Sequence, residues 1–380
     1  MGSSVDTTMG DPTTDTDLPP LGCGARLPLP GTLCQVDQPL ELPEGCMPRP
    51  VLVADVVGDG HDDVLVACAG GPLVVYPGQA SGIGDWQMVS DSAEAAGPGP
   101  MDMAVAQLDG QGGIDIVLVN DIPVDGVRVF YQAENGSFTY DDFDPNGPSP
   151  TSVAIGPWFG QELPDILVTL TSSDVVSRME NNGGTFVAGQ GLVVTEPRDV
   201  ALGQLDGEGG VDIAVVSGNP DRLTLFFNMG GGVAGPGIII NDSFGTEPNR
   251  VLLNDIDLDL DVDILYTRGG AGSLRALRGD GMGGFVPDVA DVGTMLRGLD
   301  DGDFDGNGLP DAVVADWDDG LAVFVMLLDN QQVPAPIAIV PVALGGQPWS
   351  ISAGYVDGDE LADVVVSTEN GQVILIQSSP

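Results

Sequence analysis

The sequence contains no lysine, one histidine and four cysteines, and only 5% of its 380 residues are aromatic. Without lysine, Schiff-base and lysine general-base chemistry are excluded, and a single histidine leaves little for a zinc site or a catalytic triad. No apolar run reaches the roughly 18 residues of a membrane-spanning helix. All 11 basic residues are arginine against 57 acids, so the net charge is 11 − 57 = −46. Nucleic acid and anionic membranes need a basic face, which excludes both as partners.

Turn-forming residues are abundant. The chain has 56 glycines and 30 prolines, and aspartate makes up 46 of the 57 acids. Aspartate competes with helices for backbone hydrogen bonds, so this composition predicts short strands joined by many turns. A hydrophobic content of 42% argues against intrinsic disorder.

The N-terminal region indicates export from the cytoplasm. Residues 1–22 form a polar Ser/Thr/Asp/Gly linker similar to the tether behind the lipid-anchored cysteine of bacterial surface lipoproteins, so we expect a mature secreted or surface chain whose native precursor carries a lipid anchor. Cys23, Cys34, Cys46 and Cys68 form no CxxC pair. Their even number predicts two disulfides with three connectivities open, which favours an oxidising compartment. The alternative is four free thiols in a cytosolic protein.

A unit of about fifty residues recurs along the chain. One aspartate aligns at intervals of 47–52 residues, in seven copies: Asp63, Asp115, Asp165, Asp212, Asp263, Asp311 and Asp363. Fifteen residues earlier, six copies have proline: Pro48, Pro100, Pro150, Pro197, Pro248, Leu296 and Pro348. Each copy contains short apolar runs separated by Gly- and Asp-rich turns. Four strands per copy at this period predict an all-β, seven-bladed β-propeller.

The ends of the chain predict how the ring closes. The propeller is expected over residues 48–380, with repeats starting near 48, 100, 150, 197, 248, 296 and 348. The seventh copy ends after three strands. We expect the segment 23–47, around residues 34–42, to supply the missing fourth strand, since an open edge exposes unpaired backbone groups. The nearby cysteines would lock this seam.

The loop before each aligned aspartate has nine positions suited to a hard cation. In the sixth copy, oxygens come from Asp303, Asp305, Asn307, the carbonyl of Leu309 and Asp311, with glycine at position six for the sharp turn. Calcium accepts about 6–8 oxygen ligands in flexible geometry, so the loop predicts a calcium site. The alternative is a set of turn-forming aspartates without metal.

This Asp-x-Asp-x-Asn-Gly-x-x-Asp signature, within repeats from residue 48 to about 377, resembles the FG-GAP or VCBS repeats of integrin α-subunit propellers and many bacterial surface proteins. The resemblance implies structural calcium in loops between the first and second strands, on the lower face of the ring. It also implies that partners bind the upper face.

The other loops match the signature to different degrees. After the sixth, we rank the fifth (Asp255, Asp257, Asp259, Asp261, Asp263), then the first (Asp55, Asp59, His61, Asp63) and seventh (Asp357, Asp359, Asp363), then the fourth (Asp206, Glu208, Asp212) and second (Asp109, Gln111, Asp115). Leu260 takes the glycine position of the fifth loop, so a different loop geometry is expected there. Gln107 and Gln204 begin the second and fourth loops as weak ligands. The third loop has Pro157 and Phe159 at ligand positions and is expected to be metal-free.

Four arginines lie near the start of the repeat, three of them at the same position. Arg49, Arg198 and Arg297 directly follow the aligned position, Arg250 lies one residue further on, and Trp349 takes this place in the seventh copy. If the first strand is innermost, they ring the upper mouth of the central channel. We hypothesise that this rim binds an anionic group, a carboxylate of a partner protein or an acidic sugar. The alternative is that the arginines pair with neighbours such as Asp102 and Asp199.

These patterns favour a non-enzymatic, calcium-stabilised interaction or adhesion module outside the cytoplasm, and we expect a monomer. No catalytic residue is assigned, because His61 lies inside a metal loop, where a solvated side chain is the simpler interpretation. A lectin is the second hypothesis, but the four tryptophans share no register: Trp86, Trp158, Trp317 and Trp349. A polysaccharide lyase is the third, with only the arginine rim available for an acidic sugar. Adaptation to salt is an alternative cause of the acidity.

Overall fold

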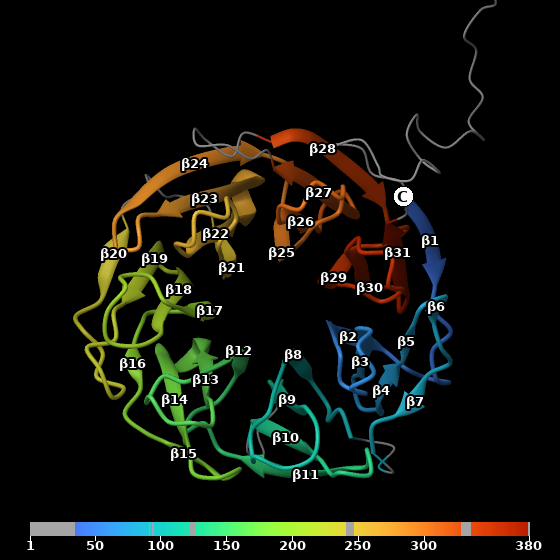
Figure 1. Cartoon of the computed structure of the whole chain (residues 1–380), viewed down its shortest axis with the longest axis horizontal. Helices are drawn as coiled ribbons and strands as arrows, with labels where there is room; N and C mark the ends of the chain where they lie inside the picture. The colour runs from blue at the N-terminus through green and yellow to red at the C-terminus, as the bar shows by residue number, and fades with distance from the viewer. Residues whose placement is uncertain are drawn as a thin grey trace, which may run out of the picture.

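Seven antiparallel sheets stand around a central channel (Figure 1), and the predicted seven-bladed propeller is confirmed. The computed structural model describes residues 35–378, except 91, 93–94, 122–125, 241–246 and 328–335. Cys23 and Cys34 lie outside the described residues, as does the predicted linker 1–22.

Each blade has four strands in meander order, from the channel outward. The innermost strands are β2 (Pro48–Ala54), β8 (Pro100–Ala106), β12 (Pro150–Gly156), β17 (Pro197–Gly203), β21 (Pro248–Asn254), β25 (Leu296–Gly302) and β29 (Pro348–Gly354). The second strands are β3 (Asp63–Cys68), β9 (Asp115–Asn120), β13 (Asp165–Leu170), β18 (Asp212–Gly218), β22 (Asp263–Arg268), β26 (Asp311–Asp316) and β30 (Asp363–Thr368). The third strands are β4 (Leu73–Tyr76), β10 (Val127–Gln132), β14 (Val175–Asn181), β19 (Asp221–Phe226), β23 (Ser273–Gly279), β27 (Leu321–Leu327) and β31 (Val373–Ser378). The outer strands are β7 (Gln87–Met88), β11 (Phe138–Phe143), β15 (Phe186–Ala188), β20 (Ile238–Ile240), β24 (Phe285–Asp291), β28 (Pro336–Ala343) and, in the seventh blade, β1 (Gln35–Pro39). Blade 3 adds β16 (Leu192–Val193), and β5 (Gly78–Gln79) pairs with β6 (Gly82–Ile83) outside the blades.

The second strands explain why the apolar runs in the sequence are continuous rather than alternating. A strand such as β9, with the sequence DIVLVN, is buried at every position. Each blade packs against a neighbour on both faces, so both sides of this strand face apolar side chains. The core consists of clusters between adjacent blades, such as the one that joins Val66 of blade 1 to Val365 of blade 7.

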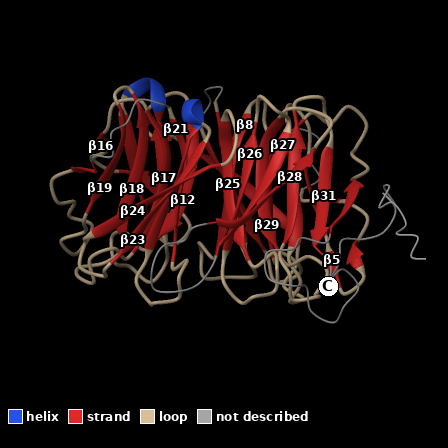
Figure 2. Cartoon of the chain, turned by 90° about the horizontal axis from the view of Figure 1, so that it is seen from above, coloured by secondary structure: helices blue, strands red, loops and turns tan. Residues whose placement is uncertain are grey.

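The two ends of the channel carry different structures. The innermost strands begin on the face that carries the short 3-10 helices η1 (Thr171–Ser173) and η2 (Gly269–Ala271), at the top of Figure 2. Pro150 is paired with Leu170, next to η1, and Pro248 with Arg268, next to η2. We call this the upper face. The nine-residue loops between first and second strands therefore lie on the opposite, lower face.

A β-bulge interrupts the start of every innermost strand. In β17, Pro197 pairs with Ser217 and Asp199 with Val216, so Arg198 is left out of the ladder. A register shift occurs at the same place in the other six blades. Bulges bend a strand and re-aim a side chain. Here one residue is left out of the ladder in five blades and two in blades 1 and 5, at the upper end of the channel.

The ring closes with the N-terminal strand, as predicted. β1 pairs antiparallel with β31, from Gln35 opposite Ser378 to Pro39 opposite Ile374. A disulfide then joins Cys46, on the segment that leaves β1, to Cys68 at the end of β3 in blade 1. The segment that crosses from the last blade to the first is thus covalently fixed. None of the described helices is long and apolar enough to cross a membrane.

Candidate functional site

The aligned aspartate is a structural clamp, whether or not its loop carries other metal ligands. In the third loop, Asp165 is fully buried; it accepts a hydrogen bond from the backbone N–H of Phe159 at 2.8 Å and one from Asn181 at 2.9 Å. These bonds tie the loop to the end of the third strand. Two equivalent bonds are made by Asp63, Asp115, Asp212, Asp263 and Asp363. The recurrence of aspartate at this position is therefore explained by the fold and does not by itself indicate metal.

The sixth loop gathers three carboxylates around one point. One oxygen from each of Asp303, Asp305 and Asp311 lies within 4.8 Å of the others. Asp303 also accepts the backbone N–H groups of Gly306 at 2.8 Å and Gly308 at 2.8 Å, which shape the turn. Asp305 and Asp311 are fully buried. The loop can present several hard oxygens to a cation without rearranging its backbone.

The fifth loop follows the same backbone path as the sixth, although it lacks the glycines. Leu258 and Leu260 have φ values of +56° and +78°, close to the +70° and +84° of Gly306 and Gly308 in the sixth loop. The different geometry expected for this loop is not observed. A left-handed non-glycine residue costs about 1–2 kcal/mol and persists where surrounding contacts require it. Both leucines are more than half exposed, so the requirement comes from the loop's polar side chains rather than from the core.

Charge in the fifth loop is incompletely compensated. Oxygens of Asp255, Asp257 and Asp263 lie within 4.8 Å of one another. One buried oxygen of Asp257, Oδ1, has no hydrogen-bond donor among the described residues, and the other lies 3.9 Å from Arg278. Burial, followed by repulsion from Asp259, raises the pKa of Asp257. Burial likewise raises the pKa of Asp263 to about 6. An unpartnered buried carboxylate oxygen among other carboxylates suits a divalent cation.

In the second and fourth loops, a glutamine amide lies where a metal would be coordinated. Gln107 Nε2 donates to the carbonyl of Gln111 at 2.8 Å and to that of Gly113 at 2.5 Å. Gln204 makes the same bonds, to Glu208 at 3.1 Å and to Gly210 at 2.9 Å. The second carbonyl in each case occupies position seven, the expected metal-binding carbonyl. Both glutamines therefore point their donor group inward instead of serving as the weak oxygen ligands predicted.

The first and seventh loops are intermediate. Asp55 accepts the backbone N–H of Gly58 at 2.6 Å, and Asp59 accepts that of His61 at 3.1 Å. In the seventh loop, burial, followed by repulsion from Asp357, raises the pKa of Asp363 to about 8. Within the described residues, the three-carboxylate clusters are those of the fifth and sixth loops, and neither the first nor the seventh loop forms one.

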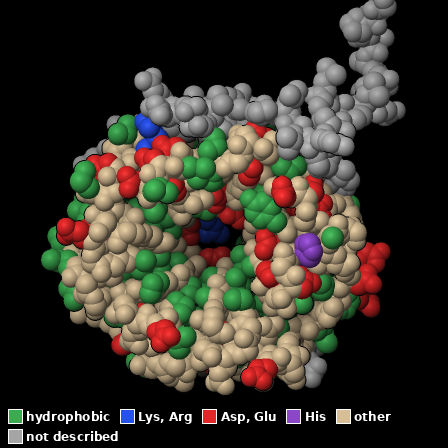
Figure 3. Space-filling view, in the orientation of Figure 1, with side chains coloured by type: hydrophobic (Ala, Val, Ile, Leu, Met, Phe, Trp, Pro, Cys, Tyr) green, Lys and Arg blue, Asp and Glu red, His purple; other side chains and the backbone are tan. Residues whose placement is uncertain are grey.

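At the upper end of the channel, the bulged residues line an open cavity of about 290 Å³. Basic side chains are visible deep in the channel when the molecule is seen from the face that carries the single histidine (Figure 3). The cavity is lined by Met101, Thr151, Thr171, Arg198, Asn249, Arg250, Arg297, Pro348 and Trp349. The structure thus brings together four of the five residues predicted for the rim, and the fifth, Arg49, stacks on Trp349 with its guanidinium 4.5 Å from the ring centre.

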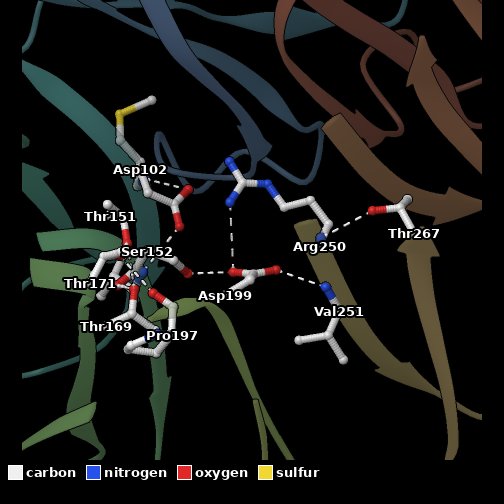
Figure 4. A network of polar contacts seen from close by, with 12 residues as sticks. Asp102, Thr151, Ser152, Thr169, Thr171, Pro197, Asp199, Arg250, Val251 and Thr267 are labelled. Atoms are coloured by element: carbon white, nitrogen blue, oxygen red, sulfur yellow. Dashed lines mark hydrogen bonds and ion pairs between the residues drawn. The ribbon is translucent and has the colours of Figure 1, made fainter. Parts of the chain in front are cut away.

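Arg250 differs from the other rim arginines, because it lies one position deeper and acts as a counter-ion (Figure 4). Its Nη1 is 3.8 Å from Asp199 Oδ1. Asp199 also accepts the hydroxyl of Ser152 and the backbone N–H of Val251. Burial raises the pKa of Asp102 to about 6, while Arg250 acts in the opposite direction. For this one arginine, the alternative of pairing with a neighbouring aspartate is the arrangement observed, and the partner is Asp199.

The remaining three rim arginines keep their charge uncompensated. Arg198 Nη1 donates to Asn249 Oδ1 at 2.7 Å. Arg297 lies over Trp317, 4.1 Å from the ring centre. No described carboxylate comes within ion-pair distance of Arg49, Arg198 or Arg297. The sequence analysis did not identify Asn249 and Trp317 as part of the site. Asn249 could have been found, because it follows the aligned proline as Arg198 does. Trp317 shares no repeated position, so nothing in the sequence pointed to it.

Residues 303–366 match the FG-GAP-like repeat family. A search of curated proteins found no match. Among solved structures, the crystal structure of BBS1N in complex with ARL6DN, soaked with mercury, is similar with a TM-score of 0.62 at 13% identity, over 92% of this chain and 97% of that chain. The same complex soaked with lead gives a TM-score of 0.56 at 12% identity, over 91% of this chain and 96% of that chain. At this identity the likeness shows the fold alone. The chain is therefore a seven-bladed β-propeller in which the stretch from the sixth loop to β30 matches the FG-GAP-like repeat.

Proposed function

We propose that this protein is a non-enzymatic, calcium-stabilised interaction or adhesion module that works outside the cytoplasm and binds its partner with the upper face. The observation that carries the proposal is the division between the two faces. Carboxylate loops occupy the lower face, while the upper face has an open cavity lined by hydrogen-bond donors and an aromatic ring. The structural relative BBS1N forms a complex with the protein ARL6DN, which supports an interaction role for the fold.

Calcium would be held first in the fifth and sixth loops. In the sixth, the ligands would be Asp303, Asp305, Asn307, the carbonyl of Leu309 and Asp311. The unpartnered oxygen of Asp257 and the strained leucines support a cation in the fifth loop. A bound cation would neutralise clustered carboxylates and tie the first strand of the blade to the second.

Two further observations support the remaining parts of the proposal. The disulfide between Cys46 and Cys68 is typical of an oxidising compartment. Against catalysis, the only histidine, His61, belongs to a loop on the lower face, away from the upper cavity, which has no nucleophile paired with a base. Cleavage of a uronic-acid polysaccharide by the pure protein would contradict this part of the proposal.

The calcium part is tested by thermal unfolding with calcium and with EDTA, together with metal analysis. Since a cation bound only to the folded state stabilises it, we expect a clear fall in the melting midpoint on chelation. Asp303→Asn with Asp305→Asn should remove the part of this calcium-dependent stabilisation that comes from the sixth loop. Asp206→Asn in the fourth loop is the control and should leave the fall in melting midpoint on chelation unchanged. A midpoint insensitive to EDTA, with no calcium in the protein, would overturn this part.

The binding face is tested by photo-crosslinking in an extract of the source organism. A photoreactive phenylalanine replaces Asp318, an exposed residue on the upper face, or Val57, an exposed residue on the lower face. We expect a discrete protein adduct from the upper position and none from the lower. Adducts from the lower position alone, or from neither, would contradict the proposal.

A further inference from the structure

We propose that the upper mouth of the channel is a carboxylate-binding site, which receives an Asp or Glu side chain from a protein partner whose surface is otherwise basic. The inference rests on the proposed interaction function and specifies its chemistry. The site consists of Arg49, Arg198 and Arg297, with Asn249 and Trp349 between them; we call it the arginine mouth.

The sequence of the bulged positions is biased in a way that the rest of the chain is not. The residue that follows the aligned position lies in the bulge of every blade; these seven residues are Arg49, Met101, Thr151, Arg198, Asn249, Arg297 and Trp349. Acids outnumber arginines 57 to 11 in the whole chain, yet this ring has three arginines and no acid. A solvated surface of this protein would carry aspartates. The ring instead concentrates positive charge at the upper opening of the channel.

The arginines are held so that their hydrogen-bonding edges remain available. The guanidinium of Arg49 lies over Trp349 and that of Arg297 over Trp317, at 4.5 and 4.1 Å from the ring centres. Stacking uses the flat face of a guanidinium and leaves its N–H groups in the plane of the group free. In Arg198, one terminal nitrogen is fixed by Asn249 and the others can still donate. A planar, oriented fork is the arrangement that binds a carboxylate through two parallel hydrogen bonds.

The acids directly below the mouth do not cancel its charge. Asp199 is paired with Arg250 and accepts the backbone N–H of Val251 at 2.8 Å. Asp102 accepts the backbone N–H of Val153 at 3.0 Å. These carboxylates are committed to contacts between blades and to Arg250. The three outer arginines therefore face the opening as a positive ring above a layer in which Asp199 and Asp102 share Arg250.

Strained backbone also occurs at this opening. The residues just before the inner strands of blades 3, 4 and 5 are left-handed, with φ values of +57° at Ser149, +46° at Glu196 and +45° at Glu247. Each precedes a proline, which normally holds the preceding residue in an extended conformation. Such strain costs of order 1–3 kcal/mol per residue and clusters where a structure must present side chains in a fixed way. Here it fixes the turn that leads into the bulge.

The net charge of the whole molecule favours a carboxylate on a protein over one on an acidic polysaccharide. At −46, the protein repels polyanions such as acidic polysaccharides and attracts basic surfaces. A single acidic side chain on a basic partner satisfies both the long-range attraction and the local site. The overall charge would thus attract the partner, and the arginine mouth would fix how the partner is oriented in the complex.

The test uses the full chain with calcium, labelled with ¹⁵N-arginine and followed by NMR. Because the chain has only 11 arginines, each Nε–H signal can be assigned by substitution. The probe is a short lysine-rich peptide with one central Glu, and the matched peptide has Gln instead. We expect the Glu peptide to shift the signals of Arg198 and Arg297, to leave Arg128 unchanged, and to bind at least tenfold more tightly than the Gln peptide.

Variants separate the site from general charge. Arg198→Gln with Arg297→Gln should reduce Glu-peptide binding to the level of the Gln peptide. Arg128→Gln, on the third strand β10, where Arg128 pairs with Asp142 of the outer strand β11, should not. Unchanged melting midpoints establish that the variants fold. Equal binding of both peptides, or tighter binding of an oligouronate, would overturn the assignment. Failure here together with upper-face crosslinks would refute the arginine mouth alone, whereas absence of those crosslinks refutes the interaction function itself.

Discussion

The side-chain amide of Gln107 lies 2.8 Å from the carbonyl oxygen of Gln111 and also donates to the carbonyl of Gly113. Its own carbonyl accepts the backbone N–H of Gly110 at 2.8 Å. One neutral group therefore satisfies inward-facing carbonyls that a cation satisfies in calcium loops. Loops two and four are closed by the amides of Gln107 and Gln204, and loops five and six each gather three carboxylates that could hold a metal.

Exchange of this amide for a carboxylate should convert the second loop into a metal site. With Gln107→Asp, the loop has the same types of oxygen donor as the sixth, since Asp109, Gln111 and Asp115 are already present. We expect isothermal titration to detect one additional calcium per chain. Gln107→Ala should add none and should lower the melting midpoint equally with calcium and with EDTA. If Gln107→Asp gains no calcium and Gln107→Ala is neutral, the amide does not have this role.

The clamp formed by the aligned aspartate should stabilise even the loop without other ligands. Asp165→Ala would leave the backbone N–H groups of Phe159 and Asn181 without acceptors in a buried site. Each buried unsatisfied donor costs about 1–3 kcal/mol, so with two donors we expect the free energy of unfolding to fall by about 2–6 kcal/mol. Urea unfolding should give the same loss with calcium and with EDTA. Asp305→Ala is the comparison, with a loss confined to the calcium-bound protein; dependence of the Asp165→Ala effect on calcium would argue against a metal-independent clamp.

The sequence was sufficient for the fold because each copy repeats the same local chemistry. Proline is tolerated as the first residue of a strand, and aspartate ends each loop because it must accept two backbone hydrogen bonds. Those two positions, fifteen residues apart, mark where the inner and second strands begin in all seven blades. The closing strand followed from the absence of a fourth strand after Val373–Ser378.

Contacts between side chains of different repeats could not be predicted from the repeated positions. Arg250 meets Asp199 across a blade boundary. Within one blade, Arg297 stacks on Trp317 in the turn after β26, a contact that the sequence did not mark either. The inward amide of Gln107 was misassigned since glutamine can donate or accept, and its neighbours decide which. Of the three disulfide connectivities, the structure contains the bond between Cys46 and Cys68.

Removal of the closing strand should open the ring. Without β1, the backbone edge of β31, which includes the buried residues Leu375 and Ile376, would be exposed. An unpaired apolar edge lowers stability and recruits other chains. For a chain that lacks residues 1–39 we expect a melting midpoint lower by about 5–10 °C and concentration-dependent dimers or larger species in light scattering. A chain that lacks only residues 1–22 is the control; identical behaviour of both truncations would show that β1 does not hold the ring closed.

The stability of the protein should depend on pH through Asp300, a carboxylate in the channel. This carboxylate accepts the backbone N–H of Ala353 in the next blade at 2.8 Å. Burial, followed by repulsion from Asp301, raises its pKa to about 7, against about 4 in the unfolded chain. Between these values the folded state binds the proton more tightly, so the free energy of unfolding falls as the pH rises from about 4 to 7.

Asp300→Asn removes the charge but keeps an oxygen for the N–H of Ala353. The variant should therefore be more stable than the wild type at pH 8, and its advantage should be smaller at pH 5, where folded Asp300 is already protonated. Each unit of pKa shift corresponds to about 1.4 kcal/mol, and water in the channel screens part of it, so we expect the advantage to differ by about 1–2 kcal/mol between the two pH values. Urea unfolding in saturating calcium measures this, with Asp318→Asn on an exposed turn as the control. An equal effect of Asp300→Asn at both pH values would mean that Asp300 is ionised in the folded protein throughout this range.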